Sequence, residues 1–151
     1  MMRLYRVEKK KYADQFPPRG SLFGNGRWHR KGMWVVYTSE HISLAKLEAL
    51  ANSTILPKNR VISVIVLEGK APVIHFDVNN LPENWNDIPY PLSLARFIND
   101  VITRGEYVAA SVPSTQAPEE KNYLLFPEHP EFGKYVKRIE LLAIEFDVRL
   151  K

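Results

Sequence analysis

Residues 60–67 constrain the fold of this 151-residue chain more than any other segment. They read Arg-Val-Ile-Ser-Val-Ile-Val-Leu, a nearly continuous run of β-branched and apolar side chains. Such a run is typical of a strand that other parts of the chain cover on both faces. The sequence therefore predicts a central β-strand over residues 60–67.

Shorter patterns predict the elements around this strand. Strands are expected at residues 34–38, 73–77, 106–112 and 142–150, and helices at 42–51 and 92–103. The prediction for 142–150 comes from strict alternation of apolar and polar residues, as in a half-buried strand. Residues 79–91, which contain three prolines, and the polar residues 114–121 are expected to be loops. Because helices and strands are interspersed without regular β-α-β order, we expect an α+β fold in a single domain over residues 1–151.

Composition limits the function classes. The hydrophobic fraction of 45% and the charged fraction of 25% are ordinary for a soluble globular protein. No apolar run approaches the length of a membrane span, and the basic residues 1–12 lack the apolar segment of a secretory signal. The absence of cysteine and the scattered histidines argue against a metal site, so a cytoplasmic protein without metal is expected. The net charge of +4 is compatible with anionic ligands, but no nucleic-acid recognition motif accompanies it.

Glu48 is an unusual acid for its surroundings. It lies in the predicted helix 42–51, whose only other charge is Lys46. On a helical projection Leu44, Leu47, Glu48 and Ala51 share one stripe, which a helix normally turns toward the core. Burying a carboxylate costs several kcal/mol unless it is paired or used. Glu48 is therefore either satisfied by an arginine or by backbone N–H groups, or it is functional.

A basic, glycine-rich loop precedes this helix. Its glycines permit positive φ and let the backbone approach a ligand closely. Strand 34–38 follows, and Ser39 is expected to cap the helix N-terminus. This order brings a cationic loop, the aromatic ring of Tyr37 and the Glu48 carboxylate toward one cleft. The loop matches neither the dinucleotide GxGxxG pattern nor a Walker loop. Its members are Gly24, Gly26, Arg27, Arg30, Lys31 and Gly32.

Several spaced motifs, taken in order, carry a family resemblance. The first half of the chain contains Gly26-Arg27-Trp28, then Val36-Tyr37-Thr38-Ser39, then a helix carrying Glu48. The second half contains Val112-Pro113-Ser114, then Asn122-Tyr123-Leu124-Leu125, then His129-Pro130. Together they resemble the RES domain family, the toxin component of RES–Xre type II toxin–antitoxin systems. The likeness runs from about Tyr5 to Phe132, and the Arg, Glu and Ser of the family name match Arg27, Glu48 and Ser114.

An early arginine of the family matches Arg6, whereas two positions depart from the family pattern. His29 stands where the family usually has asparagine after the tryptophan. Phe126 stands before Pro127, where the family often has asparagine. Both departures replace an amide near the expected site, so they bear on secondary substrate contacts.

The resemblance implies a fold similar to the diphtheria-toxin type of ADP-ribosyltransferase and an enzyme that cleaves the nicotinamide–ribose bond of NAD. NAD is then a substrate, and no cofactor is implied. Such cleavage passes through an oxocarbenium-like ribose, which the anion of Glu48 can stabilise. Arg27, assisted by Arg6, can clamp the pyrophosphate bidentately.

Three further residues complete the expected site. The ring of Tyr37 can stack on nicotinamide or its ribose. Ser114 can donate to a phosphate or hold the amide, and Asn122 is a further expected NAD contact. Each residue also has a structural interpretation. Arg27 can simply neutralise Glu48, Tyr37 and Trp28 can be core aromatics, Ser114 can cap its loop, and Asn122 can be a turn residue.

Three functions remain open on sequence grounds. The first is a toxin that degrades NAD by hydrolysis or phosphorolysis, the second an ADP-ribosyltransferase acting on a macromolecule, and the third a noncatalytic binding member of the family. The resemblance also implies an Xre-type helix-turn-helix antitoxin, with nucleic acid contacted only through that partner, and it leaves room for a homodimer. The sequence does not distinguish water from phosphate as the acceptor.

Overall fold

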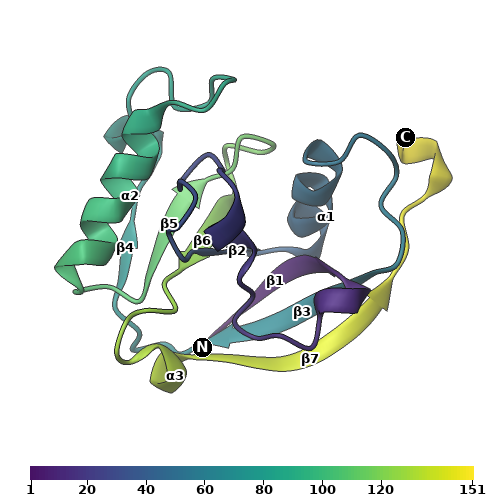
Figure 1. The fold of residues 1–151 in the computed structure, drawn as a ribbon, viewed down its shortest axis with the longest axis horizontal. Coiled ribbons are helices and arrows are strands. Elements are labelled where there is room, and N and C mark those ends of the chain that lie inside the picture. Colours follow the sequence, from purple (N-terminus) through teal and green to yellow (C-terminus); the bar gives the residue numbers. More distant parts are fainter.

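The computed structural model describes residues 1–151, in which one mixed sheet of seven strands forms the framework, in the order β4-β5-β6-β2-β1-β3-β7. Neighbouring strands are antiparallel except β4 and β5, which are parallel. The strands are β1 (Met2–Lys9), β2 (Val36–Ser39), β3 (Arg60–Leu67), β4 (Val73–His75), β5 (Ala109–Pro113), β6 (Lys121–Leu125) and β7 (Val136–Ile144). The helices are α1 (Ile42–Ala51), α2 (Leu92–Arg104) and the short α3 (Phe132–Tyr135). The α+β prediction is confirmed (Figure 1).

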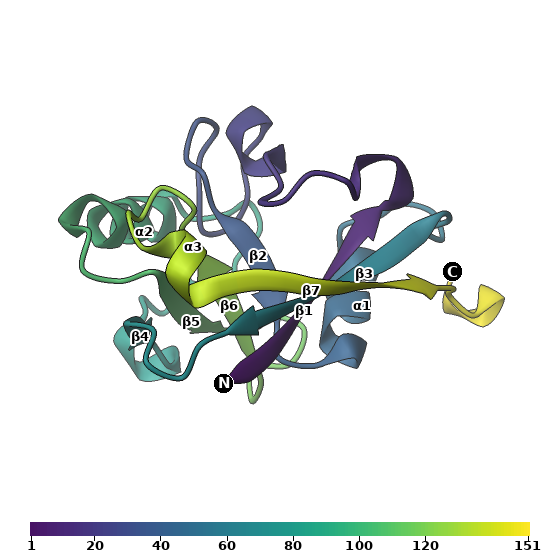
Figure 2. The same ribbon diagram turned by 90° about the horizontal axis from the view of Figure 1, so that it is seen from below.

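Strand β3 lies inside the sheet, as its composition predicts. It pairs along its whole length with β1 on one side and with β7 on the other. All of its residues after Arg60 are buried. Strand β7 is the edge strand on this side, and Figure 2 shows it crossing the view from α3 toward the C-terminus.

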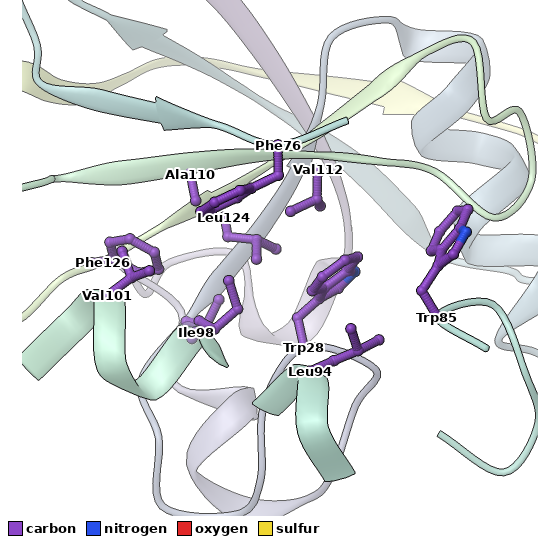
Figure 3. Close-up of a cluster of buried hydrophobic side chains, with 11 residues drawn as sticks. Trp28, Phe76, Trp85, Leu94, Ile98, Val101, Ala110, Val112, Leu124 and Phe126 are labelled. Atoms are coloured by element: carbon purple, nitrogen blue, oxygen red, sulfur yellow. The ribbon is translucent and has the colours of Figure 1, made fainter. Parts of the chain in front are cut away.

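Helix α2 covers one face of the β5–β6 part of the sheet. Its apolar residues Leu94, Ile98 and Val101 pack with Trp28, and Figure 3 shows these side chains converging below the strands. Trp28 is therefore a core residue, as its structural interpretation predicted. The helix ends where Gly105 adopts φ 70°, a conformation that favours glycine. The remaining buried members of this cluster are Val35, Phe76, Trp85, Ala110, Val112, Leu124 and Phe126.

The opposite face of the same strands contributes to a second cluster. Tyr123 and Leu125 alternate with Leu124 along β6, so successive side chains enter different clusters. Phe132 and Val136 cover the second cluster near α3. Helix α1 packs on β1 and β2, apart from α2 (Figure 1). None of the helices has the length and apolarity needed to cross a bilayer.

Helix α1 has the predicted bounds but not the predicted buried stripe. Leu44 and Ala45 are its buried residues, whereas Leu47 and Ala51 are exposed and Glu48 is half-buried. The inward face therefore lies one residue away from the predicted one. Glu48 sits at the margin of that face, where it meets a cavity instead of the core.

The prediction that Ser39 caps this helix is wrong. Ser39 is the last residue of β2, which begins at Val36 instead of residue 34. The N-cap position is His41, and its side chain makes no capping hydrogen bond. The Ser39 hydroxyl instead donates to Oδ1 of Asn122 at 2.8 Å, because Asn122 lies opposite it on β6.

The predicted strand 142–150 is also wrong in extent. Strand β7 begins earlier and ends at Ile144. The Asp147 carboxylate accepts the backbone N–H of Arg149 at 2.9 Å and starts a short 3-10 turn, which breaks the extended conformation. Phe146 is buried, with Nζ of Lys46 5.3 Å from its ring, so the C-terminal segment turns toward α1.

The boundaries of two other strands differ from the predicted ones. Strand β4 stops at His75, since Asp77 accepts the N–H of Asn79 and caps a turn. Strand β5 covers residues 109–113 instead of 106–112. The patterns in residues 2–9 and 121–125 were not assigned to strands, although both segments pair in the sheet.

Candidate functional site

A cavity of about 940 Å³ opens beside α1 and brings together residues that are far apart in sequence. Its walls come from the glycine-rich loop, strands β1 and β2, helix α1 and the loop that precedes α2. Five of the six residues expected to form the site line it: Arg6, Arg27, Tyr37, Glu48 and Asn122. The sixth, Ser114, is fully buried behind the wall.

Ser114 is linked to the cavity indirectly, by a hydrogen bond to Glu48. Its Oγ accepts the backbone N–H of Gln116 at 3.0 Å, so its proton is free to point elsewhere. It donates to Oε1 of Glu48 at 2.6 Å. The second carboxylate oxygen of Glu48 accepts no hydrogen bond from the protein, and no salt bridge involves Glu48. The carboxylate is therefore held at one oxygen and available at the other.

Arg27 does not pair with Glu48; it anchors the loop that precedes α2. One of its terminal nitrogens donates to the carbonyls of Trp85 at 2.8 Å and Asp87 at 2.9 Å. Its guanidinium lies 4.8 Å from the ring centroid of Tyr90. Burial lowers the pKa of Arg27, and Tyr90 and Glu48 oppose that shift. The other two nitrogens donate to no protein group, so they remain available to an anion.

Tyr37 is tied into the glycine-rich loop by its hydroxyl. The hydroxyl accepts the backbone N–H of Trp28 at 3.1 Å and lies 2.7 Å from Nδ1 of His29. Burial raises the pKa of Tyr37, so the phenol stays protonated. His29 is itself buried, and its Nε2 lies 2.9 Å from the carbonyl oxygen of Gly24. The departure from the family pattern at position 29 therefore falls directly against an expected site residue.

Arg6 is held by a buried acid that sequence reasoning missed. It donates to the carbonyl of Tyr37 at 3.1 Å and, through Nε, to Glu8 at 3.4 Å. Glu8 also accepts from the hydroxyl of Ser63 on the neighbouring strand β3. The period of two along β1 places Arg6 and Glu8 on one face, so recognising a strand over residues 2–9 would have revealed the pair.

The charge around the cavity is predominantly positive. Lys9 and Arg60 line it and also line a smaller pocket of about 520 Å³. That pocket has no acidic residue on its wall, and the remaining residues are Lys10, Lys11, Lys58 and Asn59. A cationic surface of this kind attracts anionic ligands toward the neighbouring cavity.

One group of side chains outside the cavity could offer ligands to a divalent cation. Glu40, His41 and Glu120 have ligand atoms that all lie within 4.8 Å of one another. The group lies where β2 leads into α1, and its histidine is mostly solvent-exposed. Exposed acidic groups of this kind are common in the absence of an ion.

Comparison with known proteins adds a family and a fold. The family model described as RES domain matches residues 3–147. A protein of Yersinia enterocolitica named Toxin Res is 29% identical over 99% of this chain and 100% of its own length. A second Toxin Res, from Photorhabdus laumondii, is 30% identical over 99% of this chain and 97% of its length.

Two further similarities concern a named relative and a solved structure. A Sphingobium protein named Prs ADP-ribosylating toxin is 30% identical over 91% of this chain and 88% of its own. Among solved structures, a chain of the crystallised M. tuberculosis MbcT–MbcA toxin–antitoxin complex superposes with a TM-score of 0.68. The match covers 99% of this chain and 86% of that one, at 11% sequence identity, and it shows a shared fold.

Proposed function

Because the chain belongs to the RES domain family, we propose that it is the toxin of a toxin–antitoxin pair and acts by cleaving NAD. The observation that carries the proposal is the Glu48 carboxylate, held by Ser114 at the wall of a cavity that Arg6 and Arg27 also line. The cavity volume of about 940 Å³ lies at the upper end of the usual range for ligand pockets, which suits a dinucleotide.

The reaction breaks the bond between the nicotinamide nitrogen and C1′ of ribose. The bonding electron pair leaves with nicotinamide, which becomes neutral, and positive charge develops on the ribose. The free oxygen of Glu48 is suited to stabilise that charge, while Ser114 fixes the carboxylate orientation. Water or phosphate then adds to C1′, and when water adds it loses a proton to the solvent or to Glu48.

The arginines are suited to the diphosphate. Arg27 is fixed at one terminal nitrogen by two carbonyls, which leaves its other nitrogens to donate to phosphate oxygens. Arg6 is oriented by Glu8 and by the Tyr37 carbonyl. Preorganised donors of this kind lose little conformational entropy when a ligand binds. Tyr37 offers a ring beside them, and Asn122 lines the same cavity.

The test is direct. Purified protein is incubated with NAD, with and without phosphate, and the products are identified by mass spectrometry. Hydrolysis gives nicotinamide and ADP-ribose, whereas phosphorolysis gives nicotinamide and ADP-ribose phosphorylated at that same C1′. The absence of nicotinamide release under both conditions would contradict the proposal and favour a noncatalytic binding role.

A second candidate function is ADP-ribosylation of a macromolecule at the same site. It is favoured by the relative that is named an ADP-ribosylating toxin and is 30% identical to this chain. Here the acceptor is a side chain or a nucleic-acid group in place of water or phosphate. Cell extract with labelled NAD discriminates the two functions: label retained on a macromolecule indicates transfer, and label found only in small molecules indicates NAD degradation.

We propose further that a separate antitoxin of the Xre type blocks the cavity. The structural neighbour was crystallised as a toxin–antitoxin complex, which supports a protein partner for this fold. Because the cavity rim is cationic, an acidic segment of the partner fits it electrostatically. Co-expression with the neighbouring reading frame, followed by inhibition kinetics, tests the idea. Binding that leaves NAD cleavage unchanged would exclude occlusion of this cavity.

A further inference from the structure

The hydrogen bonds around His29 assign every proton in a short chain of groups. A carbonyl oxygen only accepts, so the 2.9 Å contact between Nε2 of His29 and Gly24 places the ring proton on Nε2. In the neutral ring Nδ1 is then an acceptor, and at 2.7 Å it takes the proton of the Tyr37 hydroxyl. The same hydroxyl oxygen accepts the N–H of Trp28.

This chain of groups encloses the residue that carries the candidate diphosphate clamp. The backbone N–H of Gly26 donates to the carbonyl of His29 at 3.1 Å, which closes a turn around Arg27 and Trp28. No side chain fits at Gly26: a Cβ there would lie 2.6 Å from Cε1 of His29 and 2.9 Å from the Tyr37 hydroxyl. The imidazole and the phenol thus pack directly against the backbone of the turn.

We propose that His29 is a positioning residue for the NAD-cleaving reaction. By accepting the Tyr37 proton it fixes the Tyr37 ring and the Arg27 turn at the cavity wall, while the Gly24 carbonyl holds His29 in the tautomer that can accept. It acts through these two residues, and the inference rests on the proposed function. His29 is the one histidine that lines the cavity.

Protonation of His29 would rearrange this chain. A protonated ring has two N–H groups, so Nδ1 could no longer accept from Tyr37. The phenolic oxygen would accept from both Trp28 and His29, and its proton would turn toward the cavity. Burial lowers the pKa of His29, and the nearby Arg30 acts in the same direction. The charged and titratable groups that act on Tyr37 are Tyr90, Arg27 and Arg6.

Two amide variants separate the two contacts of the ring. The Asn side chain offers an acceptor near the position of Nδ1, and the Gln side chain offers a donor near the position of Nε2. His29→Gln should lower kcat/KM for NAD about tenfold, as expected for one lost hydrogen bond, whereas His29→Asn should stay within about threefold of wild type. In a Tyr37→Phe background the difference between the two variants should vanish. The control is His41→Asn, which removes an exposed imidazole outside the cavity.

Two further measurements distinguish a positioning role of His29 in the reaction from a purely structural role. The acid limb of kcat/KM should lie at higher pH in wild type than in His29→Asn, and ¹⁵N NMR of the free protein should show His29 protonated at Nε2 and not at Nδ1. Equal kinetics of the Asn and Gln variants, an unchanged acid limb, or the opposite tautomer would overturn the inference. Wild-type protein that does not cleave NAD would instead overturn the proposed function, and the NMR result, which needs no catalysis, would still decide the hydrogen-bond chain.

Discussion

The hydroxyl of Ser114 donates a 2.6 Å hydrogen bond to the carboxylate of Glu48, although 66 positions separate the two residues in the sequence. Ser114 follows β5, and Glu48 lies on α1. The contact explains how a fully buried serine can matter to a cavity that it does not line. It also gives Glu48 a fixed orientation without an opposing charge.

Replacing Ser114 by alanine should therefore impair turnover more than stability. The variant loses the donor to Glu48 and leaves the N–H of Gln116 without its acceptor, so we expect a loss of about 1 kcal/mol of stability. We expect kcat to fall about tenfold to a hundredfold, because the carboxylate is no longer held. Steady-state kinetics and thermal unfolding measure both. Ser43→Ala, at an exposed position of α1, is the matched control, and a wild-type kcat in Ser114→Ala would show that the contact has no role in turnover.

Arg27→Lys should raise KM for NAD. An ammonium group cannot hold the two carbonyls of the loop preceding α2 and also present a planar fork to phosphate oxygens. We expect about a tenfold increase in KM, as for the loss of one charge-assisted hydrogen bond. The control Arg96→Lys, on the exposed face of α2, should leave KM for NAD and thermal stability unchanged. Unchanged kinetics together with unchanged thermal stability would place Arg27 outside the binding site.

Gly26→Ala should disturb the glycine-rich loop by a steric clash. Its Cβ would collide with His29 and with the Tyr37 hydroxyl, whereas a Cβ at Gly24 would meet nothing within 4 Å. The Gly26 variant should lose about 1–3 kcal/mol of stability, as other overpacked sites do, and should bind NAD more weakly. Gly24→Ala should keep both properties. Thermal unfolding and calorimetric titration with NAD check this pair, and equal behaviour of the two variants would contradict the described packing.

Stability should decrease on mild acidification because His29 is buried in its neutral form. Its pKa in the folded protein is lowered, chiefly by burial, so the unfolded chain binds more protons as the pH falls below the ordinary histidine value of about 6.5. The contribution of neutral His29 to the free energy of unfolding is complete above the ordinary histidine pKa. It is lost as the pH falls toward the lowered pKa of His29 in the folded protein. Wild type should therefore lose more in Tm between pH 7.5 and 5.5 than His29→Asn. An equal loss in both proteins would assign the pH dependence to other groups.

The sequence was informative where local patterns decide structure. The β-branched run of β3 and the periodicity of α2 predicted those elements, because burial on two faces or on one helical stripe is written in successive residues. Strand β1 was missed since Arg3, Arg6, Glu8 and Lys9 conceal its alternation. The end of β7 was misplaced because the Asp147 turn depends on one side chain and not on hydrophobic pattern.

The site was less predictable than the elements that form it. The order of the motifs pointed to Arg27, Glu48 and Ser114, but periodicity gives no information on contacts between distant segments. The carbonyls that hold Arg27 are those of Trp85 and Asp87, in the loop that precedes α2, and no sequence pattern indicated this contact. The hydrogen bond from the Ser63 hydroxyl to Glu8 depends on the pairing of β1 with β3, which periodicity along either strand does not reveal.

The most direct test of the account is the release of nicotinamide from NAD by purified wild type and by Glu48→Gln, followed by mass spectrometry. The amide keeps the shape of the side chain and an acceptor for Ser114 but removes the charge. We expect wild type to release nicotinamide and Glu48→Gln to be slower by a factor on the order of a hundred to a thousand, with unchanged thermal stability. Glu106→Gln, at an exposed position before β5, should match wild type. If Glu48→Gln cleaves NAD within about threefold of wild type, a difference below about 1 kcal/mol in barrier height, Glu48 does not stabilise the reacting ribose and the central claim is wrong.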